Sequence, residues 1–178
     1  HPLFGPSVHS LQGQKIAVVC GRDTGQWHEW LCKIFAARGL SILETTAEEH
    51  DSAMGIVQVL THQTTEVLGR TIQKLDVDVE RTLEFTSPIY LMELLMAARH
   101  FAQWADLYAS IQMNNPETTL VLNALQQAGD ELRTIVLDKD RNQFRALFAE
   151  VHEHFGNFSE QALEQSSFLI DRLVERST

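Results

Sequence analysis

Cysteine is nearly absent from this sequence, because Cys20 and Cys32 are the only two among 178 residues and no CxxC pair occurs. Two cysteines form no disulfide framework and fit a reducing compartment, so we expect a cytoplasmic protein. No apolar run approaches the roughly 18 residues that a membrane helix requires. Basic residues are also scarce, since 14 Lys and Arg stand against 24 Asp and Glu, a net charge of −10. A nucleic-acid partner, which would need a basic face, is therefore not expected.

Glycine-rich nucleotide-binding motifs are missing as well, although a βαβ unit is expected near the start. No GxGxxG motif, phosphate loop or nucleophile elbow occurs. Residues 1–13 read as a loop, and KIAVVC at 15–20 reads as a buried strand that ends at the turn Gly21-Arg22-Asp23. A helix that ends at Gly39 and a second strand at 40–43 complete the unit. The apolar stripe of that helix is Trp27, Trp30, Leu31, Ile34 and Phe35.

Two parallel strands need neighbours to form a stable sheet, and this chain does not supply them. We expect those neighbours N-terminal to His1. The chain begins without Met in a loop punctuated by Gly and Pro, which indicates a piece of a longer protein. If the unit is half of a dinucleotide-binding fold, the half that holds the pyrophosphate precedes it. By itself the chain is then expected to lack tight NAD⁺ affinity.

From Thr46 onward the composition predicts helices only. Thr46-Ala47-Glu48-Glu49 is a capping box that opens a long helix to about Leu75. Gly55 and Gly69 inside it cost roughly 1 kcal/mol each relative to alanine, so they suggest close approach of another helix or a ligand. Further helices are expected over 106–113, from Asn115 to about Leu137, from a cap at Asp138 to Phe155, and over 159–176. This pattern predicts a mainly α fold with two parts, 1–45 and 46–178, that forms a homodimer.

The segment Thr86 to His100 organises the helical part. Ser87 followed by Pro88 predicts a helix start, because proline has no N–H and its fixed φ suits the first position. An apolar stripe follows at Leu91, Met92, Leu95 and Met96. Arg99 lies on or beside this stripe and is the only Lys or Arg over 82–132. The pattern favours a structural ion pair or a side chain that reaches solvent over a site for an anionic ligand.

The histidines give weaker signals when they are taken from the residues alone. The two histidines of 152–154 point to different helix faces, so no metal site is predicted. His50 and Asp51 are expected in the first turn of their helix, where a carboxylate complements the helix dipole, which indicates a structural role. His62 lies in mid-helix, and a core histidine and a ligand contact are equally good interpretations. His1 reads as a loop residue.

Four segments together resemble the prephenate dehydrogenases, bacterial enzymes of tyrosine biosynthesis. The segments are HPLFGP, EEHDSAMGIVQVLTHQT, TSPIYLMELLMAARHFAQ and EVHEHFGNFSEQ, and the first is similar to the family's HPMFGP. The resemblance implies the C-terminal half of such an enzyme: a βαβ remnant of a Rossmann-type nucleotide-binding domain, then an all-α dimerisation domain. The implied reaction is oxidative decarboxylation of prephenate to 4-hydroxyphenylpyruvate, with hydride passing to NAD or NADP held mainly by the preceding half.

The resemblance also implies roles for three residues. His1 matches the histidine that hydrogen-bonds the substrate's 4-hydroxyl and accepts its proton, a task that suits a neutral imidazole. Arg99 matches the arginine that holds a substrate carboxylate, so the resemblance favours its functional interpretation. His62 matches a histidine associated with feedback by tyrosine at the same pocket. Leu91 directly follows SPIY, where some relatives carry arginine, so arogenate and 4-amino-4-deoxyprephenate stay open as alternative substrates.

A hypothesis from another class also stays open: a non-catalytic, dimeric helical module that binds an aromatic ligand as a regulator. Upstream sequence separates the two hypotheses. A strand with GxGxxG before His1 in the natural reading frame supports the enzyme, and its absence supports the binding module.

Overall fold

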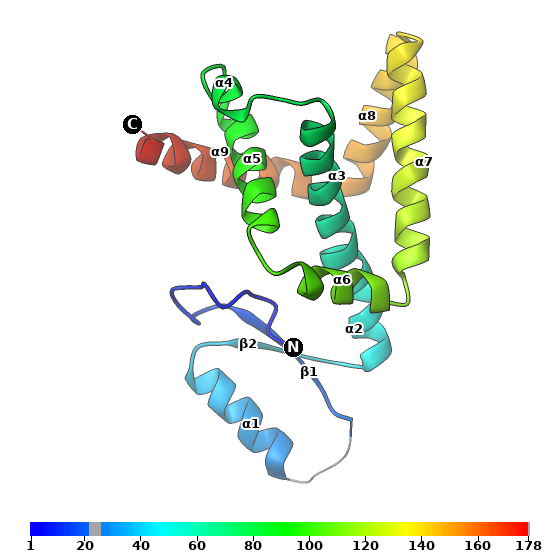
Figure 1. Cartoon of the computed structure of the whole chain (residues 1–178). Helices are drawn as coiled ribbons and strands as arrows, with labels where there is room; N and C mark the ends of the chain where they lie inside the picture. The colour runs from blue at the N-terminus through cyan, green and yellow to red at the C-terminus, as the bar shows by residue number, and fades with distance from the viewer. Residues whose placement is uncertain (22–25, 178) are drawn as a thin grey trace.

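The computed structural model describes residues 1–21 and 26–177, and it places a short sheet with one helix at one end and helices throughout the rest (Figure 1). Apart from Gly21, the turn expected at 21–23 lies outside the described residues. The mainly α fold with an N-terminal βαβ unit is confirmed. No helix in the described part of the chain is long and apolar enough to span a membrane.

The βαβ unit consists of β1 (Lys15–Val19), α1 (Gln26–Ala37) and β2 (Ser41–Thr45). The strands are parallel and in register from Lys15 opposite Ser41 to Val19 opposite Thr45. Gly39 has a φ of +81°, which an L side chain rarely adopts, and this lets the chain leave α1 and enter β2. The predicted order strand, helix, strand is therefore confirmed.

All of the apolar stripe of α1 except Phe35 is exposed in this chain. Trp27 is 59% exposed and Trp30 is 54% exposed, whereas the more buried positions are His28, Cys32 and Phe35. The parallel sheet of the described residues has only two strands, so α1 has little sheet surface to cover.

The first three residues extend the sheet at the free edge of β1. The Ala17 N–H donates to the His1 carbonyl at 2.8 Å, and the Leu3 N–H donates to the Lys15 carbonyl at 2.9 Å. Pro2 and Ile16 form an antiparallel bridge between these bonds. The loop expected over 1–13 is thus paired at its start. This pairing holds the His1 backbone against the sheet and directs its side chain toward the helices.

The long helix expected from Thr46 is divided by a π-helical segment. It comprises α2 (Ala47–Met54), the π-helix η1 (Gly55–Leu60) and α3 (Thr61–Lys74). The Thr46 side chain accepts a hydrogen bond from the Glu49 N–H at 3.1 Å, which confirms the predicted N-cap. A π-helix adds a residue to the turn and shifts the faces of the flanking helices, and such segments occur frequently at functional sites.

Six further helices follow, and one predicted cap was wrong. They are α4 (Val79–Leu83), α5 (Pro88–Phe101), α6 (Ala105–Asn114), α7 (Thr118–Leu137), α8 (Arg141–Phe155) and α9 (Phe158–Ser177). Ser87 caps α5 as predicted, accepting from the Tyr90 N–H at 3.2 Å. Asp138, however, ends α7, and Asp140 caps α8 by accepting from the N–H groups of the next helical turn. The chain reverses between them at Lys139, whose φ is +56°.

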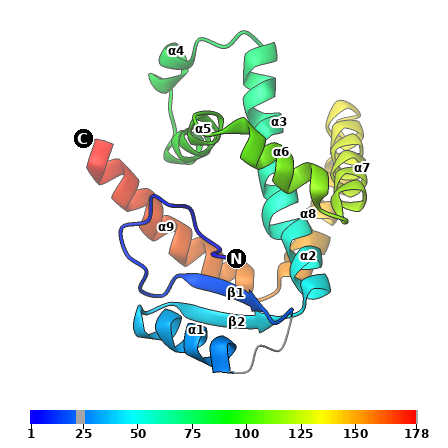
Figure 2. The same cartoon turned by 60° about the horizontal axis from the view of Figure 1, so that its bottom comes forward.

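The helices pack around η1, with α7 on one side and α6 on another, while α3 packs against α5. The antiparallel helices α7 and α8 stand together, and α9 leaves α8 to run past α5 (Figures 1 and 2). Val59 of η1 is fully buried at the centre. The outer helices keep many large apolar side chains exposed: Leu120, Val136, Leu137, Phe148, Phe155, Leu163, Phe168 and Leu169.

Gly55 and Gly69 both lie where another helix approaches closely, as their positions suggested. A Cβ added to Gly55 would lie 2.8 Å from the Glu117 Cβ, and one added to Gly69 would lie 2.2 Å from the Phe101 ring. Both distances are below van der Waals contact. The glycines therefore allow η1 to meet the start of α7 and α3 to meet α5.

We expect Gly55→Ala to destabilise the protein by about 1–2 kcal/mol, because overpacking outweighs the better helix propensity of alanine. Gly129→Ala is the matched control, since a Cβ at Gly129 in mid-α7 would have no neighbour within 4 Å. The control should stabilise by roughly 0.5–1 kcal/mol. Urea unfolding at fixed protein concentration measures both. Equal stabilisation by the two substitutions would show that η1 and α7 have room between them.

Candidate functional site

A cleft of about 410 Å³ lies between the N-terminal segment and the helices. Its walls come from four parts of the chain: residues 1–6, η1 with the adjoining Met54, His62 of α3, and the stretch 103–111. His1 and His62, two of the three site residues predicted from the sequence, therefore line the same cleft. The π-helical turn contributes Val57 and Gln58 to it. Aromatic and aliphatic side chains dominate the lining, as expected for a small-molecule site.

The imidazole of His1 has polar partners on both ring nitrogens. Its Nδ1 lies 2.8 Å from the Nε2 of His50, and its Nε2 lies 3.4 Å from the Gln58 amide nitrogen. His50 in turn places its Nδ1 2.9 Å from the Asp51 carboxylate. The sequence interpretation of His50 and Asp51 as residues that complement the helix dipole missed these contacts. Nothing in the sequence indicates them, because they depend on the antiparallel pairing of residues 1–3 with β1.

His62 packs against aromatic side chains on one side and lines the cleft on the other. Its ring lies edge-on to Tyr108 at 4.9 Å and 5.3 Å from the His100 ring, and it also lines the cleft. Burial lowers the pKa of His62, nearby His100 lowers it further, and Glu66 opposes both. The neutral imidazole is therefore favoured, and it can donate or accept a hydrogen bond toward the cleft.

A buried polar network supports this wall of the cleft. His100, only 8% exposed, places its Nε2 2.9 Å from a Glu66 carboxylate oxygen, which also accepts from the Gln112 amide at 2.7 Å. The Tyr108 ring lies 4.0 Å from the His100 ring. These residues join α3, α5 and α6. The sequence analysis did not identify them, since their separation along the chain matches no motif.

Arg99 is exposed and lies beside the cleft rather than among buried apolar residues. The stripe predicted to be buried is only partly so in this chain, because Leu91 and Met92 are half-buried whereas Leu95 is 49% exposed and Met96 is 56% exposed. Arg99 Nη2 donates to the Ser7 hydroxyl at 2.8 Å, directly after the lining segment 1–6. Gln103, which lies just beyond the end of α5 and donates its amide to the Arg99 carbonyl at 3.2 Å, lines the cleft.

The structural ion pair considered for Arg99 is not found. Within residues 1–21 and 26–177, no carboxylate lies within ion-pair distance of its guanidinium. Among the residues that the structure describes, its guanidinium has one hydrogen-bond acceptor, the neutral Ser7 hydroxyl. Arg99 does not itself line the cleft, and its guanidinium keeps donors available for an anion next to the lining segment 1–6.

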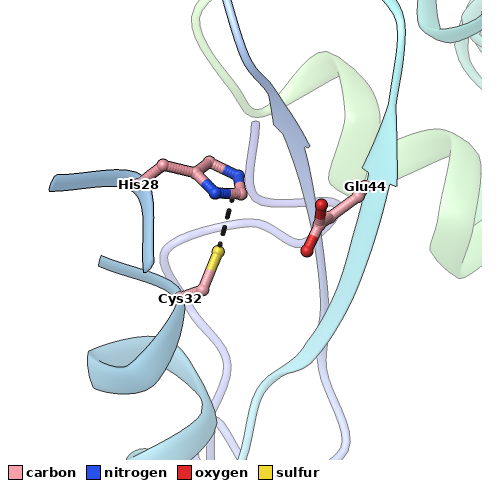
Figure 3. A group of neighbouring side chains, drawn as sticks. All are labelled: His28, Cys32 and Glu44. Atoms are coloured by element: carbon pink, nitrogen blue, oxygen red, sulfur yellow. Dashed lines mark hydrogen bonds between the residues drawn. The ribbon is translucent and has the colours of Figure 1, made fainter. Parts of the chain in front are cut away.

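Another group of side chains, on the βαβ unit, has the donor types of a metal site. His28 and Cys32 lie one turn apart on α1 and face Glu44 of β2, and their potential ligand atoms lie within 4.8 Å of one another (Figure 3). The sequence analysis did not anticipate this group. The Cys32 sulfur already lies 3.8 Å from the His28 Nε2, and Glu44 is exposed to solvent. A thiol–imidazole contact beside a solvated carboxylate accounts for all three side chains.

Comparison with known proteins gives the family. Residues 46–150 match the family described as prephenate dehydrogenase, dimerization domain. The chain is 37% identical to the T-protein of Haemophilus influenzae over 172 residues, and this aligned region covers 97% of this chain and 45% of the T-protein. It is 35% identical over 160 residues to the probable arogenate/prephenate dehydrogenase of Methanocaldococcus jannaschii, covering 88% of this chain and 36% of that protein.

A third relative, the 4-amino-4-deoxyprephenate dehydrogenase of Streptomyces pristinaespiralis, is 31% identical over 156 residues, covering 88% of this chain and 52% of that protein. The chain thus spans about half or less of the curated relatives it matches. The family match nevertheless covers more than half of this chain and begins at Thr46, where the α-helical part begins. The chain belongs to the prephenate dehydrogenase family and contains its dimerization domain.

Proposed function

We propose that this chain is the C-terminal part of a prephenate dehydrogenase, which converts prephenate to 4-hydroxyphenylpyruvate and CO₂ while NAD⁺ or NADP⁺ is reduced. One observation carries the proposal: His1 and His62, far apart in the sequence, line one cleft with Arg99 at its edge. The names of the relatives support the same class of reaction. Residues 1–45 would complete a nucleotide-binding domain, and residues 46–178 would form the dimerisation and substrate-binding domain.

In the proposed reaction His1 acts as the general base. Its Nε2 accepts the proton of the substrate's 4-hydroxyl as the hydride leaves the ring carbon that bears it, and that carbon becomes a carbonyl. Loss of the ring carboxylate as CO₂ then makes the ring aromatic, and the ring oxygen regains the proton to give the phenol. The Gln58 amide now near Nε2 would give way to this hydroxyl. Arg99 holds a substrate carboxylate that is present throughout the reaction. The rings of His62 and Tyr108 face the substrate ring across the cleft.

The cofactor does not have its main site in these residues. Binding of a dinucleotide pyrophosphate uses a glycine-rich turn at a helix N-terminus, and this sequence contains no GxGxxG motif. We propose that a preceding nucleotide-binding half supplies the hydride acceptor. The choice between NAD and NADP would rest with that half, because it carries the residue that reads the ribose 2′ position.

Prephenate is the substrate we propose, and the chemistry of His1 separates it from 4-amino-4-deoxyprephenate. Prephenate, arogenate and 4-amino-4-deoxyprephenate share the ring, its carboxylate and a side-chain carboxylate; arogenate differs from prephenate in the side chain and keeps the 4-hydroxyl, whereas 4-amino-4-deoxyprephenate differs in the 4-substituent. A 4-hydroxyl suits the Nε2 of a neutral His1 as a proton acceptor, whereas a 4-amino group in its ammonium form would present a charge there. Tyrosine, which also carries a ring hydroxyl and a carboxylate, is the proposed feedback inhibitor at the same cleft, with His62 as a contact.

The test is turnover by the protein translated from the full natural reading frame. With prephenate and NAD⁺ or NADP⁺, we expect one equivalent each of reduced cofactor, CO₂ and 4-hydroxyphenylpyruvate. The 178-residue chain alone should bind NAD⁺ weakly and turn over no substrate. Saturable binding of an aromatic ligand by the full-length protein without any cofactor reduction would instead support the regulatory binding module.

We further propose that the protein is a homodimer formed through the helices after Thr46 and that it resides in the cytoplasm. The exposed apolar residues of α7, α8 and α9 support the dimer, since Leu120, Phe148 and Phe168 are 67%, 61% and 59% exposed in the single chain. Analytical ultracentrifugation at micromolar concentration should give a dimer. Phe148→Glu should shift the population to monomers, whereas Glu150→Gln on the same helix should not. A monomeric wild-type protein would contradict the proposal.

A further inference from the structure

His50 and Asp51 connect the proposed base to a carboxylate through two short contacts. The His1 Nδ1 lies 2.8 Å from the His50 Nε2, and the His50 Nδ1 lies 2.9 Å from an Asp51 carboxylate oxygen. The side chain of His50 is 18% exposed and that of Asp51 is 51% exposed. The contacts join the segment paired with β1 to helix α2, so they cross the boundary between the two parts of the chain.

The hydrogen-bond pattern assigns the protons when both rings are neutral. An ionised carboxylate only accepts, so the His50 Nδ1 carries a proton and donates it to Asp51. The His50 Nε2 is then an acceptor, and the His1 Nδ1 must donate to it. This leaves the His1 Nε2 without a proton and with its lone pair toward Gln58 and the cleft. That is the tautomer a general base requires.

We propose that His50 and Asp51 are positioning residues that hold His1 in the tautomer and orientation of a base, as a carboxylate orients a catalytic histidine in hydrolase triads. The inference rests on the proposed function for its catalytic consequence but not for the hydrogen bonds themselves. His50 and Asp51 act through His1 and do not touch the substrate. The pair also stabilises the imidazolium that forms on His1 when it takes the hydroxyl proton.

A role at the helix dipole alone does not account for this arrangement. The acidic residues in the first turn of α2 are Glu48 and Glu49, and Asp51 lies beyond that turn, where the dipole has weakened. The Asp51 carboxylate contacts the His50 ring, whose other nitrogen meets His1. Glu48→Gln is therefore a matched control, because it removes a first-turn charge from the same helix and leaves His50 untouched.

The tautomer of His1 can be measured independently of enzyme activity. In the full-length protein labelled with ¹⁵N in histidine, at a pH where the rings are neutral, His1 should carry its proton on Nδ1. The His1→Asn variant identifies its signals. Asp51→Asn should abolish that preference, and Glu48→Gln should keep it. A wild-type His1 with its proton on Nε2 would overturn the proposal, whatever the enzyme assay shows.

Steady-state kinetics then measures the consequence. Asp51→Asn and His50→Leu should each lower kcat by roughly 10- to 100-fold, the usual effect of removing a group that orients a functional histidine, with KM near the wild type. His50→Gln, which keeps an acceptor near the Nε2 position, should recover most of the loss. The Glu48→Gln and His152→Gln controls should match the wild type. Wild-type kcat in Asp51→Asn would overturn the proposal. Because the Asp51 side chain is 51% exposed, we expect this variant to fold.

The experiments distinguish failure of the proposed function from failure of the proposed positioning role. If the full-length wild-type protein shows no dehydrogenase activity, the proposed function is wrong, and the ¹⁵N spectrum still decides the tautomer of His1. If activity is present but Asp51→Asn changes neither kcat nor the tautomer, the proposed function stands and the positioning role is wrong.

Discussion

Replacing His1 with asparagine is expected to lower kcat by roughly 10²–10⁴-fold, the contribution of a general base, and to change KM little. The reason is that His1 acts only as the hydroxyl proton leaves, so its contribution belongs to the transition state. Asparagine keeps a side chain that can hydrogen-bond the hydroxyl but cannot take its proton. Stopped-flow or steady-state measurement of cofactor reduction in the full-length protein gives the value.

His1→Asn should also lose the acidic limb of the pH–rate profile, because that limb comes from protonation of the His1 imidazole, which the variant lacks. His9→Asn is the matched control, since His9 is an exposed histidine of the same N-terminal segment and does not line the cleft. It should keep both kcat and the limb. An acidic limb that survives in His1→Asn would assign the base to another residue, and His62 would then be the first candidate in the cleft.

Replacing Arg99 with alanine is expected to raise KM by about 10- to 100-fold with kcat nearly unchanged. A carboxylate held in the ground state and the transition state alike contributes uniform binding, and hydrogen bonds to charged groups are worth roughly 1.5–3 kcal/mol. Arg99→Lys should recover only part of the loss, because an ammonium cannot bind a carboxylate as a fork.

The hydrogen bond from Arg99 to Ser7 provides the control for this prediction. Ser7→Ala removes the one acceptor that Arg99 has in the described chain and keeps the guanidinium. It should raise KM far less than Arg99→Ala does. A wild-type KM in Arg99→Ala would show that the arginine serves only to hold the N-terminal segment.

Local signals in the sequence predicted the start and end of elements well. Thr46 and Ser87 cap their helices through side-chain oxygens, and Gly39 and Gly156 end theirs with positive φ. Asp138 shows the limit of such signals, because two aspartates flank the turn and the helix begins only after the second. The π-helix was not predicted, because the residue pattern of 47–75 is that of a continuous helix; in the structure this segment packs against α7, and Gly55 allows the close approach.

Local sequence signals predicted less of the candidate site than of the helices and strands. The residues by themselves gave His1 no role, and the family resemblance supplied one. The structure then showed what neither could: His50 meets His1 only because residues 1–3 pair with β1, and His100 meets Glu66 only because α3 packs on α5. The apolar stripe beside Arg99 did not predict the burial of its residues, because helical spacing shows which residues share a face but not whether a single chain buries that face.

The most direct measurement is a crystal structure of the full-length protein with NAD⁺ and 4-hydroxyphenylpyruvate. The product's phenolic hydroxyl should lie within hydrogen-bond distance of the His1 Nε2, with Gln58 displaced from that atom, and a carboxylate should bind the Arg99 guanidinium. His62 and Tyr108 should face the ring. A product bound outside this cleft, or one whose carboxylate lies at His1 and whose hydroxyl lies at Arg99, would contradict the account.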